Sequence, residues 1–230
     1  MAQALRTLLQ ITDSALPIGG FAQSDGLEAL TELLEAGDVD LPDLLAAHAA
    51  LTVAVGDTFF VDAAWHGADQ GEAGAQALAM TARADVAARP ARLQRATALR
   101  VGAGILRVAR QIAECDERAR IDAVAATVGD VTPRASMFGA VAQSLRVGRE
   151  EANEAFLYTA LAGMANAAVR LRLCSTLEAQ RALREALRRA PEARPSDDAA
   201  TREGEWGFAS PLLEIATMRH ETRSPRLFAS

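Results

Sequence analysis

Helical periodicity runs through almost the whole chain, and no segment alternates apolar and polar residues as a half-buried strand would. Apolar residues recur every three or four positions, for example at Leu27, Leu30 and Leu34 and again over 101–112. Alanine supplies much of the apolar content, and aromatic residues make up only 4%. Because alanine favours helix and allows close packing between helices, the sequence predicts an all-α fold, a single multi-helix, bundle-like domain.

Capping residues predict where several helices begin. Asp40 precedes one helix, and Ser175-Thr176-Leu177-Glu178 is a capping box before another. Thr132 is expected to cap a third helix, with Pro133 at its first helical position. The long helix expected after Pro90 has apolar stripes on two sides, which predicts a central position in the fold.

Composition divides the chain into three regions. Residues 1–190 are predicted to form the helical domain. Residues 191–205 have no apolar period and contain proline, glycine and many charges, which predicts a flexible linker. Residues 206–230 are apolar again and are expected to form a C-terminal partner-docking tail. Such a tail either folds onto its own domain or becomes ordered when a partner binds.

The charged residues exclude several function classes. The chain contains no lysine, so neither a Walker A phosphate loop nor a Schiff base can form. A net charge of −6 argues against a nucleic-acid binder that neutralises phosphates. No signal peptide is recognisable, and no apolar run reaches the ~18 residues of a membrane span. We therefore expect a cytoplasmic protein that binds neither nucleic acid nor membrane.

Catalytic and metal-binding motifs are also missing from the sequence. It has no nucleophile elbow, no HExxH motif and no glycine-rich phosphate loop. Cys115 and Cys174 lie far apart in helical patterns and are expected to be buried structural thiols. The histidines are scattered, at His48, His66 and His220. The sequence therefore predicts no catalytic residues, no cofactor and no metal site within one chain, although a weak site between subunits stays open.

The two ends of the chain carry its most distinctive motifs. Residues 15–28 and residues 210–230 each mix apolar anchors, turn formers and a few charges, which is typical of a docking surface. The candidate partner-binding residues within them are Phe21, Ser24, Gly26, Glu28, Met218, Arg219, His220, Glu221, Arg226, Leu227 and Phe228.

These motifs resemble those of the UreF family of urease accessory proteins. The run from Leu16 to Glu28 is similar to the opening motif of the family. Met218-Arg219-His220-Glu221, followed by Arg226-Leu227-Phe228, is similar to its C-terminal signature. Phe138-Gly139 and the Asn166–Leu171 segment match internal pieces of the family in the expected order. The chain departs from the family pattern at 22–23, 132–137 and 173–175.

The resemblance implies an all-helical, non-catalytic homodimer that works as an assembly chaperone. In the family such a protein bridges UreD (called UreH in some organisms) and the GTPase UreG, and the complex delivers nickel to apo-urease. Residues 206–230 are expected to dock on UreD, and residues 21–28 to help receive UreG. The expected apolar anchors and acid-pairing arginines are Met218, Leu227, Phe228, Arg219 and Arg226.

Two other classes of function compete with this interpretation. An all-helical small-molecule enzyme of the heme-oxygenase-like type needs inward-facing acids, histidine or cysteine, and a closed polar cavity would favour it. A helical transcriptional regulator needs a basic recognition helix near one terminus. The first ~35 residues are acidic to neutral, which argues against the regulator.

Overall fold

The computed structural model describes residues 2–20, 23–34, 39–69, 71–191 and 207–220. Helices form nearly all of this part of the chain, and it contains no strand, so the predicted all-α class is confirmed. In chain order the elements are α1 (Ala2–Ile11), α2 (Leu27–Leu33), α3 (Leu41–His48), η3 (Ala49–Asp57), α4 (Thr58–Gly67), α5 (Gly71–Ala87), α6 (Arg92–Ile112), α7 (Cys115–Val128), α8 (Arg134–Ser144), α9 (Arg149–Arg170), α10 (Thr176–Arg189) and α11 (Pro211–His220).

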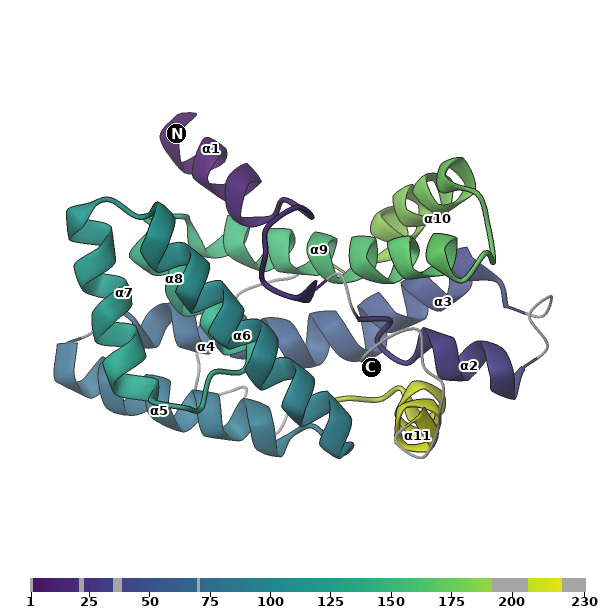
Figure 1. Ribbon diagram of the computed structural model, residues 1–230, viewed down its shortest axis with the longest axis horizontal. Coiled ribbons are helices and arrows are strands. Elements are labelled where there is room, and N and C mark those ends of the chain that lie inside the picture. The colour runs from purple at the N-terminus through teal and green to yellow at the C-terminus, as the bar shows by residue number, and fades with distance from the viewer. Residues whose placement is uncertain (1, 21–22, 35–38, 70, 192–206, 221–230) are drawn as a thin grey trace.

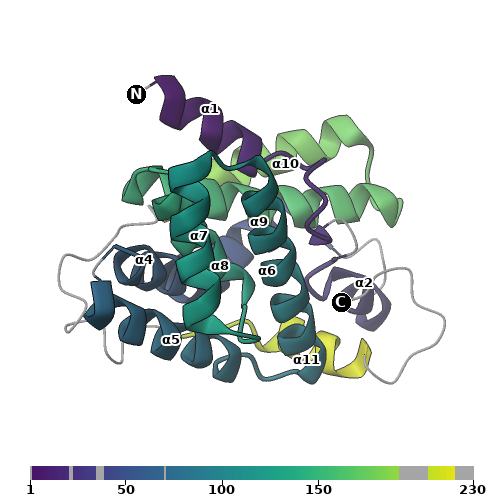
Figure 2. The same ribbon diagram turned by 60° about the vertical axis from the view of Figure 1, so that its left-hand side comes forward.

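Two long helical segments run side by side along the length of the molecule (Figure 1). One is α9, and the other is the continuous rod of α3, η3 and α4, in which the middle nine residues are π-helical. The helices α5 to α8 gather at one end of this pair, whereas α2, α3, α10 and α11 lie at the other end (Figures 1 and 2).

The core is densest around α8, nearly all of whose residues are buried between α4 and α6. Glycine makes both of these contacts possible. A Cβ added at Gly139 would overlap the carbonyl oxygen of Val61 on α4, and a Cβ at Gly102 on α6 would overlap that of Thr132. The Phe138-Gly139 piece therefore sits where two helix backbones approach too closely for any side chain.

Two of the three predicted helix starts are confirmed. The Asp40 side chain accepts a hydrogen bond from the Asp43 amide at 3.0 Å, and Ser175 and Glu178 form the reciprocal capping box. The prediction that Thr132 caps α8 is wrong. Its hydroxyl instead donates to the carbonyl of Leu99 at 3.1 Å, and the helix begins after Pro133.

The predicted burial of both thiols is wrong for Cys115. This residue is exposed at the start of α7, where the Glu114 amide donates to the Glu117 carboxylate at 3.0 Å and completes the helix start. Cys174 is half-buried, and burial together with the nearby Glu178 carboxylate raises the pKa of its thiol.

The rod from Leu41 to Gly67 is long and apolar enough to cross a membrane by length and composition alone. This corrects the expectation that no apolar run of such length exists. The rod lies in the middle of the structure, and 61% of its most apolar window is buried by neighbouring helices. Core helices of soluble proteins pass the same test, so packing within this domain accounts for its apolar character.

The close approach of α8 to α4 predicts that replacing glycine by alanine has opposite effects on stability at two positions. Gly139→Ala should destabilise the fold by about 1–3 kcal/mol, because the new methyl group forces the two helices apart. Gly163→Ala on α9 is the matched control, because a Cβ there meets nothing within 4 Å. It should be neutral or stabilising by up to about 1 kcal/mol through helix propensity. Thermal unfolding followed by circular dichroism measures both, and equal melting temperatures for the two variants would contradict the packing argument.

Candidate functional site at the junction of the chain ends

The N-terminal motif forms a tight turn that leads into α2. Asp25 and Gly26 have positive φ values of 49° and 86°, and the amide of Leu27 donates to the carbonyl of Ser24 at 3.0 Å. Gly26 suits this conformation because it has no Cβ. The turn is not a surface loop, because Ser24 is 1% exposed and the neighbouring Glu28 is 9% exposed.

The C-terminal segment returns to the middle of the molecule and bonds to η3. The amide of Ala209 donates to the Leu51 carbonyl at 2.9 Å, and the amide of Gly207 donates to the Val55 carbonyl at 3.4 Å. A hydroxyl pair of Thr52 and Ser210 at 2.7 Å completes the attachment. π-Helical turns often occur at functional sites, and this one receives the chain end.

Phe208 anchors this segment. Its ring stacks on Phe60 with centroids 6.5 Å apart, and the guanidinium of Arg89 lies 5.3 Å from the centre of the ring. A Cβ at Gly56 would come within 2.5 Å of the Phe208 ring, so the absence of a side chain on η3 provides the space that the ring occupies.

The helix that follows, α11, packs against the N-terminal motif. Its inner face is formed by Leu213, Ala216 and Thr217, all buried. A Cβ at Gly26 would lie 2.7 Å from the Thr217 hydroxyl, which shows how closely α11 approaches the turn before α2. Two motifs almost 190 residues apart in sequence therefore form one structural unit (Figure 2).

The outer face of α11 carries an apolar stripe. Leu212, Ile215 and Met218 are 64%, 48% and 45% exposed, and their spacing of three residues places them on one side of the helix. We call these three residues the α11 stripe.

The predicted partner-binding residues thus have different surroundings. Met218 and Arg219 are exposed on α11, whereas Ser24, Gly26 and Glu28 are buried beneath or beside that helix. His220 ends α11, but its side chain lies outside the described part of the structure. The others outside the described residues are Phe21, Glu221, Arg226, Leu227 and Phe228.

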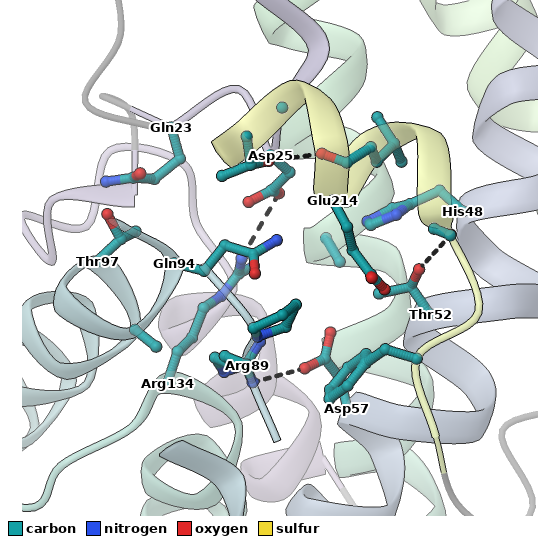
Figure 3. A pocket seen from close by; sticks show the side chains of 18 of the residues that line it. Gln23, Asp25, His48, Thr52, Asp57, Arg89, Gln94, Thr97, Arg134 and Glu214 are labelled. Atoms are coloured by element: carbon teal, nitrogen blue, oxygen red, sulfur yellow. Dashed lines mark hydrogen bonds and ion pairs between the residues drawn. The ribbon is translucent and has the colours of Figure 1, made fainter. Parts of the chain in front are cut away.

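A small cavity of about 90 Å³, lined by both polar and apolar side chains, lies between α11, η3, α6 and the turn before α2 (Figure 3). Carboxylates, guanidinium groups, an imidazole and hydroxyls all face it. The polar lining residues are Gln23, Asp25, His48, Thr52, Asp57, Arg89, Gln94, Thr97, Arg134, Ser210, Glu214 and Thr217.

Arg89 is the most heavily paired residue at the cavity. It donates to Asp57 at 2.8 Å and to Asp85 at 2.6 Å and 3.1 Å. Asp85 is fully buried and also accepts the backbone amide and the hydroxyl of Ser136 at 3.1 Å and 2.9 Å. Burial alone would lower the pKa of Arg89, but the two carboxylates outweigh it and raise that pKa.

The imidazole of His48 reaches the cavity from the end of α3. His48 is 6% exposed, and its Nδ1 is buried without a hydrogen-bond partner among the described residues. Burial lowers its pKa below the ordinary 6.5, although Asp25 and Asp57 act in the opposite direction and Arg134 acts with it. Arg134 lies 4.0 Å from the Asp25 carboxylate and 5.1 Å from the centre of the Phe156 ring.

Of the residues that line this cavity, sequence analysis singled out only Gly26, as a partner-binding residue, and none of the polar ones. A usable signal was present, because Asp57, Asp62 and Asp85 interrupt apolar helices, where an acidic residue stays buried only if it is paired. Asp62 is held in this way by Arg149 at 2.6 Å. Periodicity alone could not predict which residues pair with these carboxylates, since the partners come from different helices.

The cavity does not have the features of a metal centre or a cofactor pocket. Within the described ranges, no group of three or more His, Cys, Asp or Glu side chains is placed to hold a metal ion. Pockets for drug-sized ligands usually measure about 300–1,000 Å³, which is several times larger than this space. The geometry therefore does not support an enzyme of the heme-oxygenase-like type at this cavity.

Comparisons with known proteins agree over almost the whole chain. The UreF family model matches residues 29–187. A urease accessory protein UreF from Chromohalobacter salexigens is 33% identical, and the match covers 99% of this chain and 95% of the relative. Another protein of that name, from an Arthrobacter species, is 29% identical over 97% of this chain and 96% of its own length.

The buried imidazole predicts a specific pH dependence of stability. The unfolded chain takes up a proton at His48 near pH 6.5, whereas the folded chain takes it up only at lower pH. As the pH falls below about 6.5, the protein should therefore lose up to ~1.4 kcal/mol of stability per pH unit on account of this group, until the folded chain also takes up the proton. The free energy of unfolding, measured with urea at a series of pH values, should depend less steeply on pH in His48→Gln than in the original chain. The control His66→Gln, outside the cavity, should keep the original slope, and a slope unchanged by His48→Gln would contradict the assignment.

Proposed function

The chain belongs to the UreF family of urease accessory proteins, and from this premise we propose that it bridges UreD (or UreH) and the GTPase UreG during nickel insertion into apo-urease. It acts in this role as an assembly chaperone rather than as an enzyme, in the cytoplasm and as a homodimer. The observation that carries the proposal is the α11 stripe, an exposed apolar surface on a helix that is itself anchored to the core.

The residue composition of the α11 stripe and its surroundings suits a docking surface for UreD. Its three apolar residues are exposed, and the exposed Arg219 lies on the same face of α11, one turn beyond Ile215. Interfaces between proteins commonly combine an apolar centre with a polar rim. Because the inner face of α11 is already packed, a partner can bind the stripe without first folding the helix. That lowers the entropic cost of association.

The N-terminal motif supports this surface from beneath. Ser24, Gly26 and Glu28 are buried, so in this structure they do not form a surface that a partner could touch directly. We assign them a positioning role, in which the turn before α2 fixes α11 and thereby the α11 stripe. Recruitment of UreG then follows from the assembled complex with UreD.

A second exposed apolar surface, on α1, is available for an interface between two copies of the chain. Leu5 and Leu9 lie on one face of α1 and are 57% and 62% exposed, and α1 stands out from the rest of the domain (Figure 1). A second copy of the chain could cover this face without blocking α11, which is consistent with dimerisation and UreD binding at the same time.

Replacing the central residue of the α11 stripe should abolish partner binding without unfolding the protein. Ile215→Asp places a charge at the middle of the proposed interface, where central apolar residues contribute most to affinity. We expect retention of tagged UreD to fall at least tenfold, with a matching loss of urease activation in cells. Met80→Asp is the matched control, because Met80 is 62% exposed on α5, away from the stripe.

Point substitution is preferable here to truncation. Removing the chain from Pro211 onward would also delete the buried Leu213 and Ala216, so lost binding could then reflect a damaged core. Equal UreD retention by Ile215→Asp and Met80→Asp, with both variants folded by circular dichroism, would refute the proposed docking surface.

The positioning role of the N-terminal motif has a separate test. Gly26→Ala should weaken UreD binding, because its Cβ would collide with Thr217 and Leu213 of α11 and displace the helix. Gly71→Ala is the control for backbone strain, since Gly71 also has positive φ but a Cβ there meets nothing within 4 Å. Both changes cost about 1 kcal/mol of backbone strain. If the two variants retain UreD equally well, Gly26 has no special part in placing α11.

A further inference from the structure

The groups lining the cavity carry excess negative charge. Among the described residues, its charged side chains are three carboxylates and two guanidinium groups, with His48 neutral near pH 7 because burial lowers its pKa. One of the guanidinium groups, that of Arg89, is additionally shared with Asp85 just outside the lining. An anion entering the cavity would therefore meet unfavourable charge, and a cation would meet favourable charge.

The cations in the described part of the chain leave part of this negative charge uncompensated. Arg89 is bound to Asp57 and Asp85, and Arg134 lies 4.0 Å from Asp25. The Glu214 carboxylate, by contrast, has neither an ion pair nor a hydrogen bond within the described ranges. It is half-buried on α11 and turned toward the cavity (Figure 3).

A second group without a hydrogen-bond partner among the described residues also indicates a ligand site. His48 Nδ1 is buried at the cavity and has no hydrogen-bond partner among the described residues, which costs free energy unless a ligand or water bonds to it. Figure 3 shows the side chains of Asp25, Asp57, Glu214 and His48 around one common space. They come from three separate segments, namely the turn before α2, the rod of α3 and η3, and α11, so a ligand held between them would be contacted from several sides.

The size of the space limits the ligand to a few atoms. A cavity of about 150 Å³ accommodates benzene, with its six heavy atoms, so a cavity of about 90 Å³ suits a group of about four. Guanidinium has four heavy atoms and donates hydrogen bonds in several directions within one plane. We propose that this cavity is a binding site for a guanidinium group, held by Glu214, Asp57 and Asp25, with His48 Nδ1 as a further acceptor.

A guanidinium group could reach this site in two forms. One is a small free molecule, and the other is the arginine side chain of a bound partner. The chemistry of recognition is the same in both, and α11 contributes Glu214 in both. The site is distinct from the α11 stripe, which lies on the outer face of the same helix.

Isothermal titration calorimetry on the full chain tests the charge requirement. Methylguanidinium chloride is the probe, and N-methylurea, which has nearly the same shape without the charge, is the matched ligand control. We expect one saturable site for methylguanidinium and at least tenfold weaker binding of N-methylurea. Equal binding of the two probes, or no saturable binding of methylguanidinium up to 10 mM (about −2.7 kcal/mol), would overturn the proposal and leave a cavity that holds only water.

Two variants locate the binding. Glu214→Gln keeps the shape of the side chain and should weaken methylguanidinium binding at least tenfold, whereas Glu72→Gln, on an exposed position of α5, should bind as the original chain does. Thermal melting verifies that both variants are folded. Unchanged affinity in Glu214→Gln would overturn the site.

A third ligand distinguishes the two sources. N-acetylarginine methylamide represents an arginine within a polypeptide. If it binds at least as tightly as methylguanidinium, the site fits a partner's side chain. If only methylguanidinium binds, the site fits a small free molecule. Both results require a guanidinium site, and an affinity unchanged in Glu214→Gln, for a ligand that binds the original chain, would contradict it.

Discussion

A buried guanidinium holds together the parts of this molecule that meet at the chain ends. Arg89 follows α5 and reaches Asp57 of η3, while Asp85 of α5 also binds the amide and hydroxyl of Ser136 at the start of α8. The same guanidinium covers the ring of Phe208. Removing one member of such a buried network commonly costs about 3–5 kcal/mol, because an unpaired charge stays inside. The network thus fixes the relative positions of η3, α5, α8 and the C-terminal segment.

The attachment of the C-terminal segment determines what the two end motifs do. Considered separately, each motif looks like a docking surface. In the structure one of them, around Gly26, is the support, and α11 is the part presented outward. Phe208 can lie over η3 only because Gly56 has no side chain. The apolar content of the tail is therefore divided between residues that attach it and residues such as Ile215 that remain exposed.

Local features of the fold could be predicted from the sequence, and contacts between distant segments could not. The Ser175 cap was predictable because both partners lie within one turn. The Thr132 cap was mispredicted because a carbonyl on α6, 33 residues away, takes its hydroxyl instead. The cavity escaped prediction for the same reason, since Asp25, His48 and Glu214 converge only after the helices pack. What the sequence did reveal was the family, in part through motif glycines such as Gly26 and Gly139, at which the structure brings two segments close together.

The two faces of α11 couple the cavity to the exposed stripe. A helix of ten residues is marginal in isolation, so α11 is helical because its inner face is packed. A guanidinium group bound at Glu214 would interact only with the docked helix. At 100 times its dissociation constant it would therefore add about 2.7 kcal/mol to docking. By thermodynamic reciprocity, a partner that binds Leu212, Ile215 and Met218 only when α11 is docked must also raise the affinity of the cavity for its cation.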